Sequence, residues 1–353
     1  MSNKNEIIWK ILIGYLFAIF PFLNVILFSP GNGYYESPLS FFSSDNASIF
    51  LGADTLRYFH GANNIADIGF GNNVIVEFIG FLAKLSGLGW WLILGINSLI
   101  LFSTYLMLVS TFNWDVVKKY VFGLFFATPL LIFSTGSLNK EVLLICGITI
   151  LFIGLKSKSN FQVFFGLFLL ICRPIDFLFG LYACLVFGGY KKTTIIINFA
   201  VIFSLFLPLN IIFTDEIRST FIFQAFTFLD QNASKYYNFV FSYSSYPFSI
   251  ALLVFVNFGI NLFSPMISET VRESFSVTRP LLEGVALFFT SLGVSIYFLR
   301  SLIFENKEVL LFLFVWVFLH AMYPLNQLRY YIIIFPVIPL ISDLFSSRRQ
   351  QEI

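Results

Sequence analysis

Residues 89–111 read GWWLILGINSLILFSTYLMLVST, an apolar stretch that contains no charged side chain. A helix needs about 20 mostly apolar residues to cross the hydrocarbon core of a bilayer. This stretch reaches that length without interruption. The sequence therefore predicts a membrane-spanning helix over 89–111.

The rest of the chain has the same apolar character. Of its 353 residues, 58% are hydrophobic and only 11% are charged, and the mean hydropathy is +0.85. Soluble domains carry about 25% charged residues, so this chain has too few charges for a water-facing surface. The net charge of +2 does not indicate nucleic-acid binding.

Apolar runs recur from one end of the sequence to the other. They lie at 8–28, 89–111, 120–135, 141–156, 161–172, 177–190, 195–213, 281–304, 309–325 and 330–346. The first run is followed by no small-residue cleavage site and by many further runs, so it is expected to be an uncleaved span. The predicted fold is an all-α polytopic integral membrane protein of about ten transmembrane helices (10–12), with residues 1–353 in a single domain.

The distribution of basic residues predicts the sidedness. If the runs at 69–87 and 248–265 do not span, twelve of the 21 basic residues fall in short loops on one side, which the positive-inside rule assigns to the cytoplasm. These residues are Lys4, Lys10, Lys118, Lys119, Lys156, Lys158, Lys191, Lys192, Arg300, Lys307, Arg348 and Arg349. Both termini are then cytoplasmic. Two long loops, about 29–88 and 214–280, are expected outside and are predicted to hold short or re-entrant helices.

A polar break, Arg173-Pro174-Ile175-Asp176, separates the runs 161–172 and 177–190. We interpret the two runs as a helical hairpin with a polar tip. The alternative is one long kinked helix that carries an intramembrane charge pair. Proline breaks a helix in either case, and the backbone groups that it releases need partners.

The remaining polar residues gather at the predicted outer ends of the helices. After the first run, Asp54, Arg57 and Tyr58 would share one face if the segment is helical. At the start of the run 141–156, Lys140 could contact a phosphate, or it could extend to the lipid headgroups. A local ion pair or an interfacial anchor accounts for either group as well as a functional role does.

Arg173 and Asp176 are the strongest candidates, because charges among long apolar runs are costly and mark functional sites. A purely structural ion pair is the alternative. Arg272 and Arg279 fall in the second outer loop, and Arg329 and Tyr330 precede the last run. The fork of an arginine binds phosphate oxygens bidentately, although headgroup anchoring would also place Arg329 there.

Several basic clusters on one face, mixed with carboxylates and tyrosines, suit an amphiphilic ligand with an anionic head, polar sugars and a lipid tail. Lysine and arginine would hold the phosphates, and a carboxylate could remove a proton from a sugar hydroxyl. The three cysteines have no CxxC partner and no neighbouring histidine, so no metal site is predicted.

This pattern resembles the bacterial oligosaccharide repeat-unit polymerases, which are the O-antigen polymerases of the Wzy type and their EpsG-like relatives. The likeness covers the chain in outline. It is carried by Gly52-Ala53-Asp54 with Arg57-Tyr58, by Lys140-Glu141 with the later break at Arg173, and by Arg329-Tyr330. The Asp54 and Tyr58 element and Arg329-Tyr330 also look like the wider group of multi-spanning glycosyltransferases that use lipid-linked sugars.

The resemblance implies an enzyme of the bacterial inner membrane that works on the periplasmic face. It would transfer a glycan from undecaprenyl pyrophosphate to the sugar of another lipid-linked repeat unit, without metal or cofactor. Asp54 is the first candidate for the base and Asp176 the second. Arg173, Arg329, Arg57, Lys140, Arg272 and Arg279 are candidates for binding the pyrophosphate, beside Tyr58 and Tyr330. The implied partners are membrane lipids, a chain-length regulator and a flippase.

Two other functions fit the sequence. A single-sugar glycosyltransferase with a lipid-phosphate sugar donor would share the outer site, and the number of sugars added per product would separate it from a polymerase. A flippase or transporter for lipid-linked sugars would need charges along a central path. The charges here gather at helix ends instead.

Overall fold

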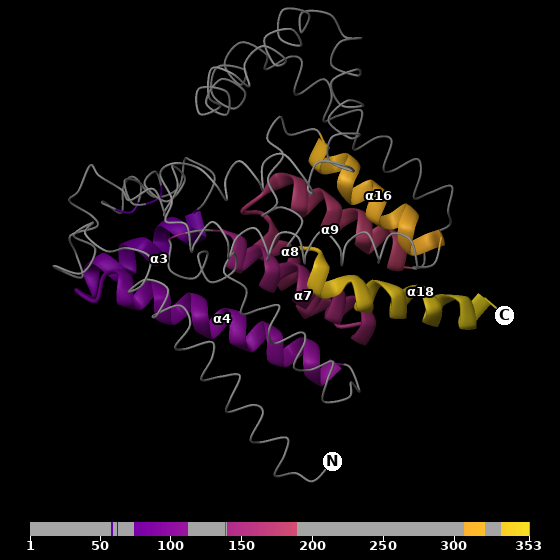
Figure 1. Ribbon diagram of the computed structural model, residues 1–353, viewed down its shortest axis with the longest axis horizontal. Helices are drawn as coiled ribbons and strands as arrows, with labels where there is room; N and C mark the ends of the chain where they lie inside the picture. Colours follow the sequence, from indigo (N-terminus) through magenta and orange to yellow (C-terminus); the bar gives the residue numbers. More distant parts are fainter. Residues whose placement is uncertain are drawn as a thin grey trace, which may run out of the picture.

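The computed structural model describes residues 58, 62, 74–111, 138, 140–188, 307–321 and 333–352 (Figure 1). Every element within these residues is helical, which confirms the all-α prediction for this part of the chain. The elements are α3 (Val74–Leu85), α4 (Trp90–Thr111), α7 (Glu141–Ser157), α8 (Asn160–Leu170), α9 (Pro174–Phe187), α16 (Lys307–Ala321), the 3-10 turn η5 (Phe335–Val337) and α18 (Ile338–Glu352).

The helix predicted over 89–111 is α4, which has 22 residues. Its segment Trp91–Thr111 has a mean hydropathy of 2.1 and is, among the described residues, the one helix both long and apolar enough to cross a membrane. Helices α8 and α9 are apolar but shorter. The span count of about ten stays a prediction, because the runs 8–28, 120–135, 195–213 and 281–304 lie outside the described residues.

Helices α7 and α8 form a closely packed hairpin. The turn between them is short because Lys158 adopts a left-handed conformation (φ 57°) and Ser159 caps α8 by accepting a hydrogen bond from the backbone N–H of Gln162. A Cβ atom on Gly166 would lie 2.6 Å from the backbone nitrogen of Leu151 and 2.8 Å from the carbonyl oxygen of Gly147. Glycine is therefore what allows the two backbones to approach, as small residues do in membrane helix pairs.

Helices α8 and α9 also fold back on each other, as the hairpin interpretation predicts. A Cβ atom on Gly180 would meet the side chains of Leu167 and Leu170, which a single continuous helix would hold far apart. The break is sharp because Arg173 is extended (φ −138°, ψ 109°) and Pro174 opens α9. The tip differs from the expected polar tip in one respect: Arg173 and Asp176 are buried.

Aromatic rings join α9, α16 and α18. Phe312 of α16 packs against Phe179 at 4.9 Å and Phe187 at 5.4 Å between ring centroids, and Phe187 packs against Phe345 of α18 at 4.8 Å. Trp316, one turn after Phe312, contacts Phe179, which lies two turns before Phe187. The order of these contacts shows that α16 runs antiparallel to α9.

The last predicted run, 330–346, is not one helix. The residues 335–337 form η5, and α18 then continues to Glu352, well beyond the apolar run. Pro336 and Pro339 account for the late start, since proline is tolerated in the first turn of a helix but not in its interior. In Figure 1, α18 extends past the central helices α7, α8 and α9 toward the C-terminus.

The run 69–87, predicted not to span, contains α3. This helix has 12 residues, fewer than a span requires. A turn with two glycines in the left-handed conformation, Gly87 (φ 70°) and Gly89 (φ 54°), connects α3 to α4. The second ambiguous run, 248–265, lies outside the described residues.

Candidate charged site at the start of α7 and α9

One arginine bridges two carboxylates at the end of the bundle where α7 and α9 begin. Arg173 donates from Nη2 to Glu141 Oε1 at 3.0 Å and from Nη1 to Asp176 Oδ2 at 3.2 Å. The exposed fraction of each of the three side chains is 4% or less. The guanidinium is therefore held in a fixed orientation and away from bulk water.

The local sequence explains why the carboxylates are at this end. Glu141 lies in the first turn of α7 and Asp176 in the first turn of α9. Helix N-termini carry unsatisfied N–H groups and partial positive charge, so acidic side chains are favourable there. Arg173 precedes α9 directly, and its extended backbone separates it from the helix while its side chain lies between both acids.

Lys140 adds a second positive charge beside this group. It is only half-buried, and it directly precedes Glu141, whose carboxylate contacts Arg173. Two cations, Lys140 and Arg173, thus accompany two carboxylates, Glu141 and Asp176. A balanced set of charges reduces the cost of burial, which is several kcal/mol for an unpaired ion. We call these four residues the charge cluster.

Helix α3 packs beside the same end of α7. A Cβ atom on Gly80 would lie 2.6 Å from Leu138, which is three residues before Glu141, and 2.8 Å from Cβ of Ala62. The backbone N–H of Ala62 donates to the carbonyl oxygen of Tyr58 at 2.9 Å, so one helical turn connects them. Tyr58 is buried, with 2% of its surface exposed. Ala62 thus lies beside Gly80 of α3, which in turn lies beside Leu138, just before the charge cluster.

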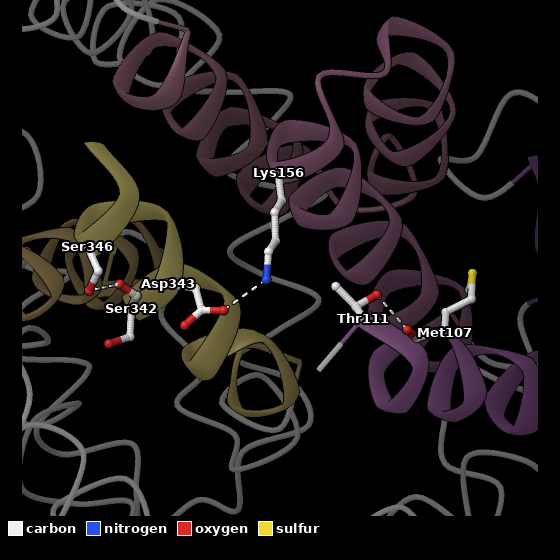
Figure 2. Close-up of polar contacts among 6 residues, drawn as sticks. All are labelled: Met107, Thr111, Lys156, Ser342, Asp343 and Ser346. Carbon is white, nitrogen blue, oxygen red and sulfur yellow. Dashed lines mark hydrogen bonds and ion pairs between the residues drawn. The ribbon is translucent and has the colours of Figure 1, made fainter. Parts of the chain in front are cut away.

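The opposite end of the bundle holds a different kind of ion pair. Figure 2 shows Lys156, near the end of α7, reaching Asp343 of α18, with 2.8 Å between Nζ and Oδ2. These side chains are 34% and 48% exposed, far more than those of the charge cluster. Arg348 of α18 also donates from Nη1 to the carbonyl oxygen of Val186 at the end of α9. These contacts attach α18 to the bundle at its more exposed end.

The chain matches no known family model, no curated protein and no solved structure. Within the described part of the chain, no three His, Cys, Asp or Glu side chains are grouped so that they could hold a metal ion.

Four of the residues singled out from the sequence are described, and three of them come together. Lys140, Arg173 and Asp176 belong to the charge cluster, and Tyr58 is buried beside α3. The other candidates lie outside the described residues: Asp54, Arg57, Arg272, Arg279, Arg329 and Tyr330.

Sequence reasoning did not place Glu141 with Arg173. Glu141 lies in the first turn of α7, and its contact with Arg173 spans 32 positions in the chain. The usable signal was charge complementarity, because Glu141 opens one apolar run and Arg173 closes another. Buried charges in apolar surroundings need partners, and this rule alone would have suggested the pair.

The arrangement can bind an anion by exchange of partners. A guanidinium offers five N–H donors in a rigid fork that matches phosphate oxygens. A phosphate that approached along the half-exposed Lys140 could take the place of one carboxylate at Arg173. The released carboxylate would then be free to accept a proton or a hydroxyl hydrogen bond.

Proposed function

We propose that this protein is a membrane glycosyltransferase that polymerises lipid-linked oligosaccharide repeat units. The observation that carries the proposal is the buried Arg173 between Glu141 and Asp176, with Lys140 at its edge. Such a group suits a substrate whose leaving group is an anionic phosphate. The likeness of the surrounding sequence to the repeat-unit polymerases supports the choice of substrate.

The proposed chemistry is displacement of a lipid pyrophosphate by a sugar hydroxyl. Negative charge develops on the pyrophosphate as the bond between its oxygen and the anomeric carbon breaks, and Arg173 and Lys140 stabilise it while the new glycosidic bond forms. Asp54 is the proposed base that removes the proton of the attacking hydroxyl. Glu141 and Asp176 hold the guanidinium in orientation before the substrate arrives. Arg57, Arg272, Arg279 and Arg329 are proposed further contacts to phosphate, and Tyr58 and Tyr330 further contacts to substrate.

The proposed setting is the bacterial inner membrane, with about ten spans, both termini in the cytoplasm and the charge cluster on the periplasmic side. Helix polarity supports this orientation. Glu141 begins α7 and Lys156 lies in its last turn, so the charge cluster and the lysine assigned to the cytoplasm are at opposite ends of one helix. Arg348, another residue assigned to the cytoplasm, contacts the end of α9 rather than its start.

A transport function receives less support from the described helices. A path for a charged or sugar-bearing group needs polar residues through the middle of the bundle. Between α9 and α16 that middle is filled by Phe179, Phe312 and Trp316, all of them buried. The charged side chains of these two helices lie in their first turns instead: Asp176 in α9, and Lys307 and Glu308 in α16.

The test is gel electrophoresis of the surface polysaccharide from cells that depend on this protein for its polymerisation. A working polymerase gives a ladder of glycan chain lengths. Arg173→Ala is expected to abolish the ladder, and Arg173→Lys to shorten it strongly, because an ammonium cannot bind bidentately. Lys156→Ala is the matched control, since it removes an ion pair at the other end of the same helix. Each variant is compared at equal protein level in isolated membranes.

A normal ladder with Arg173→Ala would refute the proposal. If the unmodified protein forms a product with a single added sugar, and not a series of glycan lengths, the enzyme is a single-sugar transferase. The number of sugars is read from the mass of the released glycan.

A further inference from the structure

Helix α8 exposes one continuous apolar face. Its exposed apolar side chains, together with that of Ile171 directly after the helix, are spaced three or four residues apart, as one face of a helix requires. They are Phe161 (76% exposed), Phe164 (70%), Phe165 (40%), Phe168 (44%) and Ile171 (53%). The rings of Phe161 and Phe165 are stacked, with 6.3 Å between centroids and 2° between planes. We call these five residues the α8 face.

The opposite side of α8 packs into the protein. Gly166, Leu169 and Leu170 are buried, and Gly166 lies against the backbone of α7. The hairpin contact thus fixes which way the helix is turned. Because that contact is made through backbone atoms, α8 cannot rotate to cover its phenylalanines without losing it.

The α8 face leads to the charge cluster. Ile171, its last member, is two residues before Arg173, and the guanidinium of Arg173 contacts Glu141, the residue after the half-buried Lys140. An apolar track therefore ends beside the charge cluster, in which Lys140 is half-buried and Arg173 is buried between its two carboxylates. An apolar surface that leads to a lysine and an arginine is complementary to an amphiphile with a long apolar chain and an anionic head.

We propose that the α8 face binds the polyprenyl chain of the lipid-linked substrate while Lys140 and Arg173 contact its phosphate. This inference rests on the proposed function and adds where the lipid lies. Helix α8 is about 16 Å long, so it would contact the part of the chain nearest the phosphate. Flat rings give a flat unsaturated chain many dispersion contacts, each small but large in sum.

Ordinary lipid could also cover exposed phenylalanines, and the test must separate the two occupants. Leu99 of α4 is the matched control because its side chain is 65% exposed and it is not part of the α8 face. A photoreactive p-benzoylphenylalanine replaces Phe164 in one variant and Leu99 in the other. Each full-length protein is reconstituted in phosphatidylcholine nanodiscs with radiolabelled undecaprenyl phosphate.

Labelling at position 164 is expected to exceed labelling at position 99 by about tenfold, which corresponds to a modest specific affinity. Lys140→Glu is expected to lower labelling at 164 several-fold and to leave labelling at 99 unchanged. Lys140 is half-buried, so this change is better tolerated by the fold than a change at Arg173. Excess unlabelled undecaprenyl phosphate should compete, and excess phosphatidylcholine should not.

Equal labelling at the two positions would overturn the proposal, since it would show ordinary lipid on the α8 face. Cross-linking of position 164 to a second copy of the chain would overturn it as well. No glycan is present in this measurement, so the labelling does not depend on whether the protein transfers glycan. A normal ladder with Arg173→Ala would reject the polymerase, whereas loss of selective labelling would reject only this lipid surface.

Discussion

Arg173 Nη2 lies 3.0 Å from Glu141 Oε1, although 32 positions separate the two residues. The contact joins the start of α7 to the turn between α8 and α9. It closes the three helices into one unit at the end where the charges are buried. The free energy of unfolding of this unit and the proposed chemistry of the site therefore depend on the same guanidinium.

Arg173→Ala is expected to destabilise the protein by about 3–5 kcal/mol, because it leaves two carboxylates buried without their cation. The triple variant Glu141→Gln, Arg173→Met, Asp176→Asn removes all three charges and should recover most of that loss. It should nevertheless form no polymer. Thermal unfolding in detergent gives the stability, and the ladder gives the function. Polymer of normal length from the triple variant would show that the cluster serves only stability.

Gly166→Ala is expected to destabilise the α7–α8 hairpin by about 1–3 kcal/mol, because the new methyl group would overlap backbone atoms of α7. Gly95→Ala is the matched control. It lies inside α4 with no heavy atom within 4 Å of the added Cβ, so the variant should be neutral or slightly more stable. Thermal unfolding of both proteins checks the difference, and equal midpoints would contradict the close packing of α7 and α8.

Phe312→Ala is expected to cost about 3–5 kcal/mol, since the ring packs among aromatic residues of α9 and α18 and would leave a cavity. Its neighbour Leu311 is 56% exposed, and Leu311→Ala should change stability by less than about 1 kcal/mol. Unfolding midpoints of the pair measure this contrast. Similar losses in both variants would mean that α16 does not present Phe312 to the core.

Introduced cysteines test the sidedness. In a protein whose three cysteines are replaced by alanine, Lys140→Cys should react with an impermeant thiol reagent added to the periplasmic side. Ser157→Cys, exposed at the other end of α7, should react only after the membrane is opened. The reverse pattern would place the charge cluster on the cytoplasmic side of the membrane and would contradict the proposed periplasmic reaction.

The sequence predicted those helices whose limits are set by length and polarity. The starts of α4 and α7 fall within one residue of the expected runs, and the break before α9 was clear from Arg173-Pro174. The start of α18 was missed because the apolar run continues through Pro336 and Pro339, where the backbone cannot continue a regular helix. An apolar run shows which residues lie in an apolar environment, but it does not show at which residue the helical hydrogen bonds begin.

The candidate site was predictable where its contacts are local. Arg173 and Asp176 are three positions apart, and their pairing follows from the turn that carries both. The pairing with Glu141 depends on how α7 lies against α8, and that packing is decided by small residues such as Gly147 and Gly166. Single glycines in an apolar run give no sign of their partners, so the tertiary contact could not be derived from the sequence.

The shortness of α8 has a consequence for the surrounding lipid. Its 11 residues rise about 16 Å, roughly half the thickness of a bilayer's hydrocarbon core. In the proposed membrane setting, such a hydrophobic mismatch would draw the two leaflets together locally or would leave the turn at Arg173 below the headgroup plane. The first response would create a dimple in the membrane at the charged residues. Shorter acyl chains would relieve the mismatch, so turnover should depend on the tail length of the host phospholipid.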